Sequence, residues 1–193
     1  GAVVPDVLTP TDADANDVLT FTLDDNTIAG LSLAVDAWSF DPSHADYQAL
    51  AAGETQDVAV AYTVTDIEGA TGQNSFTITV TGINDNPVGT FTTQQDVVEG
   101  DPVVNGQLTS TDVDNGDTAD FADTTGGVAG LTINQDGSFS FDPSDAAYQN
   151  LALGVTETIT VTYSVTDSQS GVDATPSFDI VITGVNNAPV ATF

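Results

Sequence analysis

The sequence contains no lysine and no arginine. Its 193 residues include 29 Asp and Glu residues and one histidine, so the formal net charge at pH 7 is −29. A chain without cationic side chains cannot neutralise a phosphate backbone or attach to anionic lipid, which excludes nucleic-acid binding and polybasic membrane attachment. The small partners expected for such a chain are cations.

Cysteine and long apolar runs are absent as well. Without cysteine the chain has no disulfide and no thiolate metal site. Because no run reaches 18 apolar residues, we expect no direct insertion into a membrane. High net charge is one part of the composition of disordered chains, but 40% hydrophobic residues supply enough apolar surface for a core. The chain is therefore predicted to fold.

The chain holds two copies of one sequence module. Thr11–Asp14 matches Thr111–Asp114 at an offset of 100 residues, Phe40–Ser43 matches Phe141–Ser144 at 101, and Thr81–Asn84 matches Thr183–Asn186 at 102. We expect a first domain over residues 1–86, a second over 87–189 and the start of a further repeat at 190–193. Because Val3 matches Val103, counterparts of residues 88–100 are expected ahead of Gly1, so that the chain begins within its first repeat.

Apolar residues alternate with Thr and Ser in both copies. This period of two covers residues 58–65 and 75–80 and their counterparts at 158–166 and 177–183, and it predicts half-buried strands. Asp136-Gly137 is a signal for a tight hairpin turn. Several short strands separated by turn signals in about 100 residues favour a Greek-key sandwich. The predicted fold class is all-β, with two tandem Greek-key (immunoglobulin-like) β-sandwiches in a linear array.

Acidic residues gather at the predicted ends of the domains. Asp12 and Asp14, like Asp112 and Asp114, fall between strands, Asp66 and Asp167 end the longest strand of each copy, and Asn84, Asp85 and Asn86 occupy the linker. Two carboxylates 4 Å apart repel by about 4 kcal/mol at an effective dielectric constant near 20, so a cluster needs a cation. Oxygen ligands without His or Cys favour Ca²⁺ over zinc.

Several motifs resemble the bacterial VCBS repeat. The second copy has Phe141-Asp142-Pro143-Ser144, Tyr148-x-x-Leu151, Tyr163-Ser164-Val165-Thr166-Asp167 and Gly184-Val185-Asn186-Asn187-Ala188-Pro189-Val190, and the first adds Leu50-Ala51-Ala52-Gly53-Glu54-Thr55. The resemblance covers nearly the whole chain. It implies a surface or secreted bacterial protein, such as an RTX adhesin exported by type I secretion, whose stacked sandwiches carry a ligand-binding tip away from the cell.

The placement of the acids is also similar to that of cadherin domains, whose junctions bind calcium. That likeness implies one complete calcium site, with Glu54 from the first domain, Asn84, Asp85 and Asn86 from the linker, and Glu99, Asp112, Asp114 and Asp167 from the second domain. Asp12, Asp14 and Asp66 would form the matching half-site of the first domain. Gly82 and Ala52 stand where cadherins have further acids, which implies fewer ions or weaker binding.

Three kinds of function compete for this sequence. A structural extender, rigidified by calcium and contacting neighbouring repeats, is favoured, and ligand binding is then expected elsewhere in the parent protein. A carbohydrate-binding or spacer module of a secreted polysaccharide-active protein is the alternative, but Trp38 aligns with Phe139 and is expected in the core. An enzyme is not expected, because the sole histidine, His44, aligns with Asp145 in a turn.

Overall fold

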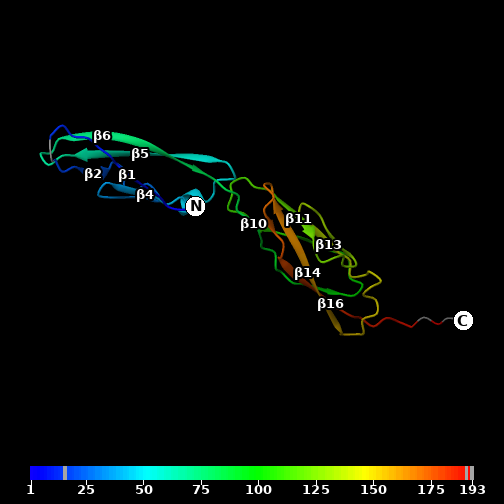
Figure 1. Ribbon diagram of the computed structural model, residues 1–193. Coiled ribbons are helices and arrows are strands. Elements are labelled where there is room, and N and C mark those ends of the chain that lie inside the picture. Colours follow the sequence, from blue (N-terminus) through cyan, green and yellow to red (C-terminus); the bar gives the residue numbers. More distant parts are fainter. Residues whose placement is uncertain (15–16, 190, 192–193) are drawn as a thin grey trace. The chain divides into compact units, whose positions relative to one another are not determined.

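The regular secondary structure of the protein is almost entirely β-strand (Figure 1). The computed structural model describes residues 1–14, 17–189 and 191, and the chain divides into two compact units, residues 1–83 and 84–193. Within the described ranges the one helical element is a 3₁₀ turn of three residues, Ala45–Tyr47. No helix in this part of the chain is long and apolar enough to cross a membrane.

The first unit consists of two three-stranded sheets. Its strands are β1 (Val4–Val7), β2 (Thr20–Leu23), β3 (Leu31–Ala34), β4 (Ala37–Phe40), β5 (Thr55–Thr65) and β6 (Thr71–Thr81). One sheet has the strand order β1-β4-β3 and the other the order β2-β5-β6. The antiparallel pair β5 and β6 is the long hairpin of Figure 1, with Thr55 opposite Thr81 and Thr65 opposite Thr71.

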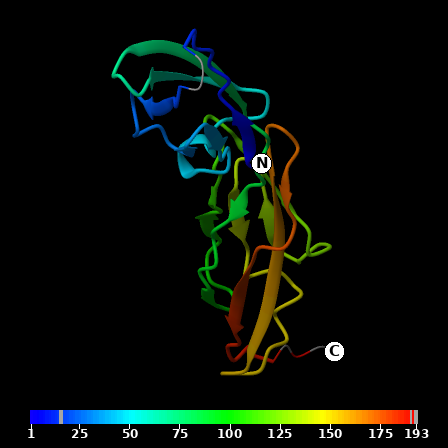
Figure 2. The same ribbon diagram turned by 60° about the vertical axis from the view of Figure 1, so that its left-hand side comes forward.

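The second unit repeats this plan with additional strands. They are β7 (Val88–Gly89), β8 (Gln95–Val98), β9 (Val104–Gln107), β10 (Ser110–Thr111), β11 (Ala119–Asp123), β12 (Leu131–Ile133), β13 (Ser138–Phe141), β14 (Thr156–Asp167), β15 (Val172–Asp173) and β16 (Ser177–Thr183). The main sheet has the order β11-β14-β16-β8, with β15 paired to β14, and the facing sheet has the order β12-β13-β9. Strand β14, the long orange arrow of Figure 2, runs along the unit.

The core of the second unit follows from the alternation in these strands. Val161, Tyr163 and Val165 of β14 are fully buried, and the residues between them are less so. Phe139 of β13 meets Phe178 of β16 with ring centroids 5.2 Å apart, so the two sheets face each other across the core. Because successive side chains of a strand point to opposite faces, this alternation produces one dry and one solvated face.

The first unit has a smaller core at the corresponding place. Phe40, Tyr47 and Val60 are buried there, whereas Trp38 packs against them and stays partly exposed. The buried Tyr47 hydroxyl donates to the carbonyl oxygen of Ala29 (2.9 Å). Tyr47 thus belongs to the core, and the expected core position of Trp38 is confirmed only as packing against the core.

The predicted fold class and the predicted hairpin turn are confirmed. Between β12 and β13, the Gly137 N–H donates to the Asn134 carbonyl oxygen (2.9 Å), and Gly137 has φ +80°. A Cβ atom at Gly137 would collide with the Phe121 ring, so both the backbone angle and the packing require glycine.

The boundary between the units falls after Ile83, three residues before the predicted one after Asn86. Asn84 and Asp85 lie with the second unit because their polar groups form hydrogen bonds to its loops, at Asp167 and Asp114. The predicted start of a further repeat at 190–193 falls on positions of which only Ala191 is described.

Candidate metal centre

Three carboxylates converge in the loop between β10 and β11 of the second unit. Asp112, Asp114 and Asp117 each place an oxygen within 4.8 Å of the others. The N–H of Asp114 donates to Asp112 Oδ1 (2.9 Å), which folds the loop back on itself. Asp114 is buried, with 5% of its surface exposed, so this charge lies largely out of water. A buried carboxylate is costly unless hydrogen bonds or a cation compensate it.

The segment that opens the second unit closes over this loop. The N–H of Asp85 donates to Asp114 Oδ2 (2.8 Å), and the Asn84 side-chain amide donates to Asp167 Oδ2 (2.8 Å) and to the Asp85 carbonyl oxygen (2.9 Å). Asp114 and Asp167 are far apart in the sequence, so residues 84 and 85 connect the loop to the end of β14. The structure thus brings Asn84, Asp85, Asp112, Asp114 and Asp167 together.

Asp167 ends β14 in a dense set of donors. Its Oδ1 accepts from the N–H groups of Gln169 (2.8 Å) and Gly171 (2.7 Å). Burial raises the pKa of the Asp167 carboxyl, but the hydrogen bonds from Asn84 and from the backbone of Gly171, Gln169 and Ser170 outweigh burial and place that pKa below its usual value. Asp167 is therefore a carboxylate anion at neutral pH.

Glycine at position 171 is a packing requirement of this centre. A Cβ atom there would collide with Asp167 Oδ2, Asn84 Nδ2 and Asn86 Oδ1. The side chain of Asn86, which the sequence also assigned to the site, therefore lies beside Asn84 and Asp167.

Four buried oxygens of the centre have no hydrogen-bond donor. Within the described residues they are Asn84 Oδ1, Asp112 Oδ2, Asp114 Oδ1 and Asp117 Oδ2. Buried polar atoms in folded proteins nearly always have a partner, and the exceptions point to a bound water or ion. The second oxygen of Asp117 does have a partner, the Ser168 hydroxyl (2.6 Å), so the loop is held in place while one oxygen stays available.

The charge of the centre requires a cation. Asp112, Asp114, Asp117 and Asp167 are four carboxylates in a chain that has no Lys or Arg to offset them. Oxygens of the first three lie within 4.8 Å of one another, and two carboxylates about 4 Å apart repel by about 4 kcal/mol at an effective dielectric constant near 20. Carboxylate and amide oxygens are hard ligands of the kind that Ca²⁺ coordinates with six to eight oxygens, some of them from water. The donor set therefore fits Ca²⁺ chemically.

Glu99 does not belong to this centre, and its assignment to the site is wrong. Its side chain is buried at the opposite end of the unit, where Oε1 accepts from the Asn187 amide (2.6 Å) and Oε2 from the Val185 N–H (3.1 Å). Glu99 directly follows β8, whose last residue, Val98, pairs with Thr183 of β16. Thr183 also lies opposite Thr156, the first residue of β14. Asp167 is the last of the 12 residues of β14, so it lies about 36 Å from Thr156 along the strand, at 3.3 Å per residue.

Sequence reasoning missed Asp117, and the repeat contains the signal that reveals it. Asp117 lies five residues beyond Asp112 in the same loop, outside the Asp-x-Asp pattern that identified Asp112 and Asp114. Its counterpart at an offset of 100 is Asp17, which belongs to the equivalent cluster of the first unit. A carboxylate present in both copies at the same distance from the Asp-x-Asp pair marks a ligand candidate.

The first unit carries a looser version of the cluster. Oxygens of Asp12, Asp17 and Asp66 lie within 4.8 Å of one another, but Asp12 is exposed and the other two are half-buried. Asp14 donates its N–H to Asp12 Oδ1 (2.9 Å) and is exposed, and it is not part of this group of three. Asp66 accepts from the Ala70 N–H (2.7 Å), as its counterpart Asp167 does from Gly171. Thus the structure brings Asp12 and Asp66 together and leaves Asp14 aside.

Glu54 lies at the end of the first unit where β5 begins. Its Oε2 accepts from the Ala51 N–H (3.1 Å), and its carbonyl oxygen accepts from the Gly82 N–H (2.8 Å). These bonds hold Glu54 in a turn beside the end of β6. Its role as a metal ligand stays a prediction.

The paired sheets and the acidic loops define a tandem of cadherin-like β-sandwiches. Solved structures with a similar fold include human protocadherin-24 EC1-2, with a TM-score of 0.54 and 15% identity over 93% of this chain and 88% of that chain. Human mucin-like protocadherin EC1-2 has a TM-score of 0.50 and 16% identity over 86% and 84% of the two chains. Protocadherin gamma B2 extracellular cadherin domains 1-5 have a TM-score of 0.51 and 14% identity over 89% of this chain and 34% of that one.

The superpositions show a shared fold alone. No family model and no curated protein sequence matches the chain.

Proposed function

We propose that the chain is a structural extender of an extracellular adhesin, and that Ca²⁺ bound at the acidic centre of the second unit stiffens it. The four buried oxygens without a donor are the observation that carries this proposal. They come from the loop at 112–117 and from Asn84, so one ion would hold both segments. Asp167 and Asn86 lie beside these ligands, and water would complete the coordination of the ion.

The stiffening follows from where the ligands lie in the sequence. Asn84 and Asp85 come directly after the first unit, and their hydrogen bonds already end on Asp167 and Asp114. An ion shared by Asn84 and the loop would fix the backbone that leaves Ile83, so a short linker would lose its freedom to bend. Without the ion, mutual repulsion of the carboxylates would favour opening of the loop.

An extracellular setting supplies the calcium that such a centre needs. Extracellular calcium modules bind with Kd values of about 10⁻⁴ to 10⁻³ M, far above cytosolic calcium levels. Binding to the folded state alone stabilises it by about 2.7 kcal/mol when calcium is present at a hundred times Kd. The bacterial adhesin setting rests on the VCBS-like motifs, and the cadherin-like fold is in keeping with it.

Isothermal titration calorimetry of the full chain with CaCl₂ tests the proposal. The double variant Asp112→Asn with Asp114→Asn should lose at least tenfold in calcium affinity at the second unit, because it removes two of the four carboxylates. The matched control is Asp36→Asn with Asp46→Asn, which removes the same charge at exposed positions. Equal heats for the wild type and the first double variant would refute the calcium centre.

A further inference from the structure

The loop of the metal centre contains an Asn-Gly pair between two of its acids. Residues 114–117 read Asp-Asn-Gly-Asp, and Asn115 and Gly116 form an exposed turn between the buried Asp114 and the half-buried Asp117. Asparagine followed by glycine loses its side-chain amide more readily than asparagine in other sequences, because glycine has no Cβ atom to obstruct attack by its own backbone nitrogen. Neither Asn115 nor Gly116 is among the ligands proposed above.

The loss of the amide requires no reagent other than water. The backbone nitrogen of Gly116 attacks Cγ of Asn115, the bond from Cγ to Nδ2 breaks, and the N–H proton passes through solvent to the departing ammonia. The five-membered succinimide that results takes up one water molecule. Opening at one carbonyl gives aspartate, and opening at the other gives isoaspartate, whose main chain runs through Cβ and Cγ and is one methylene group longer. Both products carry a carboxylate in place of a neutral amide.

The turn leaves the reacting groups free. Within the described ranges of the chain, neither the Asn115 side chain nor the Gly116 N–H forms a hydrogen bond. A Cβ atom at Gly116 would meet nothing within 4 Å, so there is open space around the attacking nitrogen. Gly116 has φ +81°, in the left-handed region that favours glycine.

The other Asn-Gly pair of the sequence, Asn105-Gly106, lies in a different setting. It is part of β9, which pairs with β13, so that Asn105 lies opposite Ser140 and Gly106 opposite Phe139. The Phe139 ring packs directly on Gly106, where a Cβ atom would collide with it. Formation of the succinimide rotates the backbone between the two residues, and in β9 that rotation would break the strand pairing. The chain therefore holds the same dipeptide once in a strand and once in an exposed turn.

We propose that Asn115 is a site of spontaneous deamidation, that its isoaspartate form opens the metal centre, and that bound Ca²⁺ suppresses the reaction. The second and third parts rest on the proposed calcium centre, whereas the first does not.

The isoaspartate form opens the centre because both ends of the turn are fixed by other segments. Asp114 Oδ2 accepts from the Asp85 N–H (2.8 Å), and Asp117 Oδ1 accepts from the Ser168 hydroxyl (2.6 Å). The remaining oxygen of each of these two acids has no donor. An extra methylene group between Asp114 and Asp117 lengthens the connection between them. It therefore shifts the two carboxylates relative to each other and weakens their hold on an ion.

Calcium would slow the reaction because succinimide formation needs the main chain of residues 115–116 to move. An ion held by Asp114 and Asp117 fixes the loop on both sides of that stretch, so the reaction proceeds from the calcium-free chain. At a calcium concentration ten times Kd, about one chain in eleven is free of calcium, and the rate should fall about tenfold. The Kd from calorimetry therefore sets the protection that is expected.

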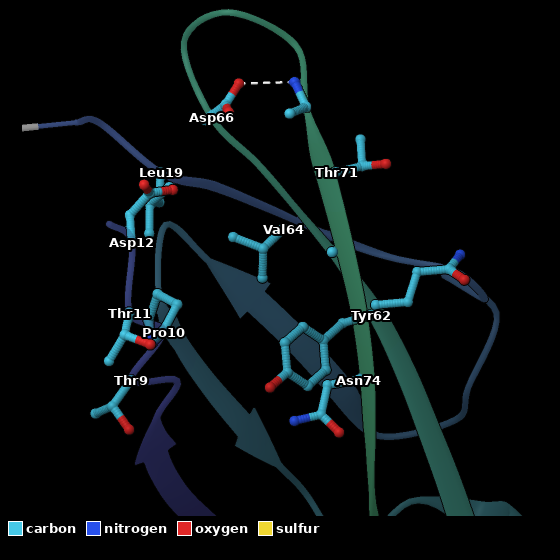
Figure 3. Close-up of a pocket in the computed structure, with 13 residues that line it drawn as sticks. Thr9, Pro10, Thr11, Asp12, Leu19, Tyr62, Val64, Asp66, Thr71 and Asn74 are labelled. Carbon is cyan, nitrogen blue, oxygen red and sulfur yellow. Dashed lines mark hydrogen bonds between the residues drawn. The ribbon is translucent and has the colours of Figure 1, made fainter. Parts of the chain in front are cut away.

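The first unit has the acids of this loop without the Asn-Gly pair. At an offset of 100 residues, Ala15 stands where the second unit has Asn115, and residues 15–16 lie outside the described part of the chain. Asp12 and Asp66 line a pocket of about 460 Å³ (Figure 3), and Asp66 accepts from the Ala70 N–H (2.7 Å). Deamidation at Asn115 should leave these acids unchanged, so they serve as a comparison within the same chain.

The test is to age the full chain at neutral pH in EGTA, and to locate deamidation by peptide mass spectrometry with fragmentation that separates aspartate from isoaspartate. In the folded chain we expect Asn115 to exchange an NH group for oxygen while Asn105 stays intact. In urea both residues should react at similar rates, because the strand pairing of β9 is then lost. Asn115 that stays intact in the folded chain, over a time in which it reacts in urea, would overturn the modification site.

The same ageing in CaCl₂ tests the protection. If calorimetry shows binding, the rate at Asn115 should fall by the factor that Kd and the calcium concentration give. Binding without a slower reaction would overturn the protection. Deamidation in EGTA without any calorimetric binding would overturn the calcium centre and its protection, and it would still support Asn115 as the modification site.

Two variants separate the longer main chain from the added charge. Freshly purified Asn115→Asp has the new carboxylate on an unchanged backbone and should bind calcium at least as tightly as the wild type. Aged wild type enriched in isoaspartate should bind about tenfold more weakly or less, as when the supports of metal ligands are disturbed. Asn115→Gln forms the corresponding larger ring far more slowly and should keep its affinity through the same ageing. Equal affinities of aged wild type and aged Asn115→Gln would overturn the opening of the centre.

Discussion

The backbone N–H of Asp85 donates a hydrogen bond of 2.8 Å to Oδ2 of Asp114, which lies 29 residues further along the chain. This bond satisfies one oxygen of a buried carboxylate and leaves the other, Oδ1, without a donor. The same division recurs at Asp117, where the Ser168 hydroxyl occupies Oδ1 and Oδ2 is unpartnered. One oxygen of each acid holds the loop in place and the other is available to a cation.

The first prediction concerns Asp117, the ligand that the sequence motifs did not identify. Asp117→Asn should lower calcium affinity about tenfold, because it removes one of the carboxylates that face the ion. In calcium-free buffer the same variant should be as stable as the wild type or more stable, since one repulsive charge is gone. Calorimetry and thermal melts in EGTA measure the two effects. Lower stability in EGTA with unchanged affinity would mean that Asp117 acts only as a structural residue.

The second prediction concerns Gly171. Gly171→Ala should destabilise the second unit by about 1–3 kcal/mol, the usual cost of overpacking, and should weaken calcium binding, because the new methyl group would displace Asp167, Asn84 and Asn86. Urea denaturation and calorimetry measure these effects. Gly72→Ala is the control, since a Cβ atom there meets nothing within 4 Å. An unchanged calcium affinity in Gly171→Ala would show that Asp167, Asn84 and Asn86 do not contribute to calcium binding.

The third prediction concerns acid sensitivity away from the metal centre. The Ser144 hydroxyl donates to Asp142 Oδ1 (2.6 Å) and lowers the pKa of that carboxyl, helped by the Ser144 N–H. Ser43 lowers the pKa of Asp41 in the same way in the first unit. Ser144→Ala should raise the pKa of Asp142 towards its usual value and leave that of Asp41 unchanged, as NMR titration can measure.

The effect on stability follows from the direction of these shifts. A carboxyl whose pKa is lower in the folded state stabilises the fold above the unfolded-state pKa, about 3.9, and that contribution disappears as the pH falls through the folded-state pKa. The wild type should therefore lose more stability than Ser144→Ala between pH 6 and pH 3. An equal loss in both proteins would show that the Ser144 bond does not contribute.

The fourth prediction concerns the linker. Small-angle X-ray scattering of the full chain should report a narrower range of dimensions in calcium than in EGTA, because the ion would fix the segment at residues 84–86. The double variant Asp112→Asn with Asp114→Asn should scatter alike in both buffers. Wild-type scattering profiles that are the same in calcium and in EGTA would contradict the stiffening of the linker, but they would not contradict the binding of calcium.

The internal repeat made the fold predictable, and the same repeat shows why part of the site was not. Alternation of apolar and hydroxyl residues located β5, β6, β14 and β16, since a half-buried strand requires that pattern. Asp112, Asp114 and Asp167 were found because they end strands or sit in a short loop. Glu99 was misplaced because a position in the sequence does not say at which end of a strand pair a residue lies.

The extent to which each strand is covered was also outside the reach of sequence patterns. The period of β6 is the same as that of β16, so the strand is predicted equally well in both units. Whether a parallel neighbour covers it depends on residues distant in the chain, and parallel pairing leaves no local signal comparable to a hairpin turn. The difference between Phe76 and Phe178 appears only when their exposure is compared.

A crystal structure of the chain grown with CaCl₂, with anomalous difference maps recorded at long wavelength, tests the central claim most directly. The account predicts a calcium peak 2.3–2.6 Å from the free oxygens of Asp112, Asp114, Asp117 and Asn84, at the usual distance of calcium from its oxygen ligands. An ordered loop with no anomalous peak at millimolar calcium, or with water bridging those oxygens, would contradict it.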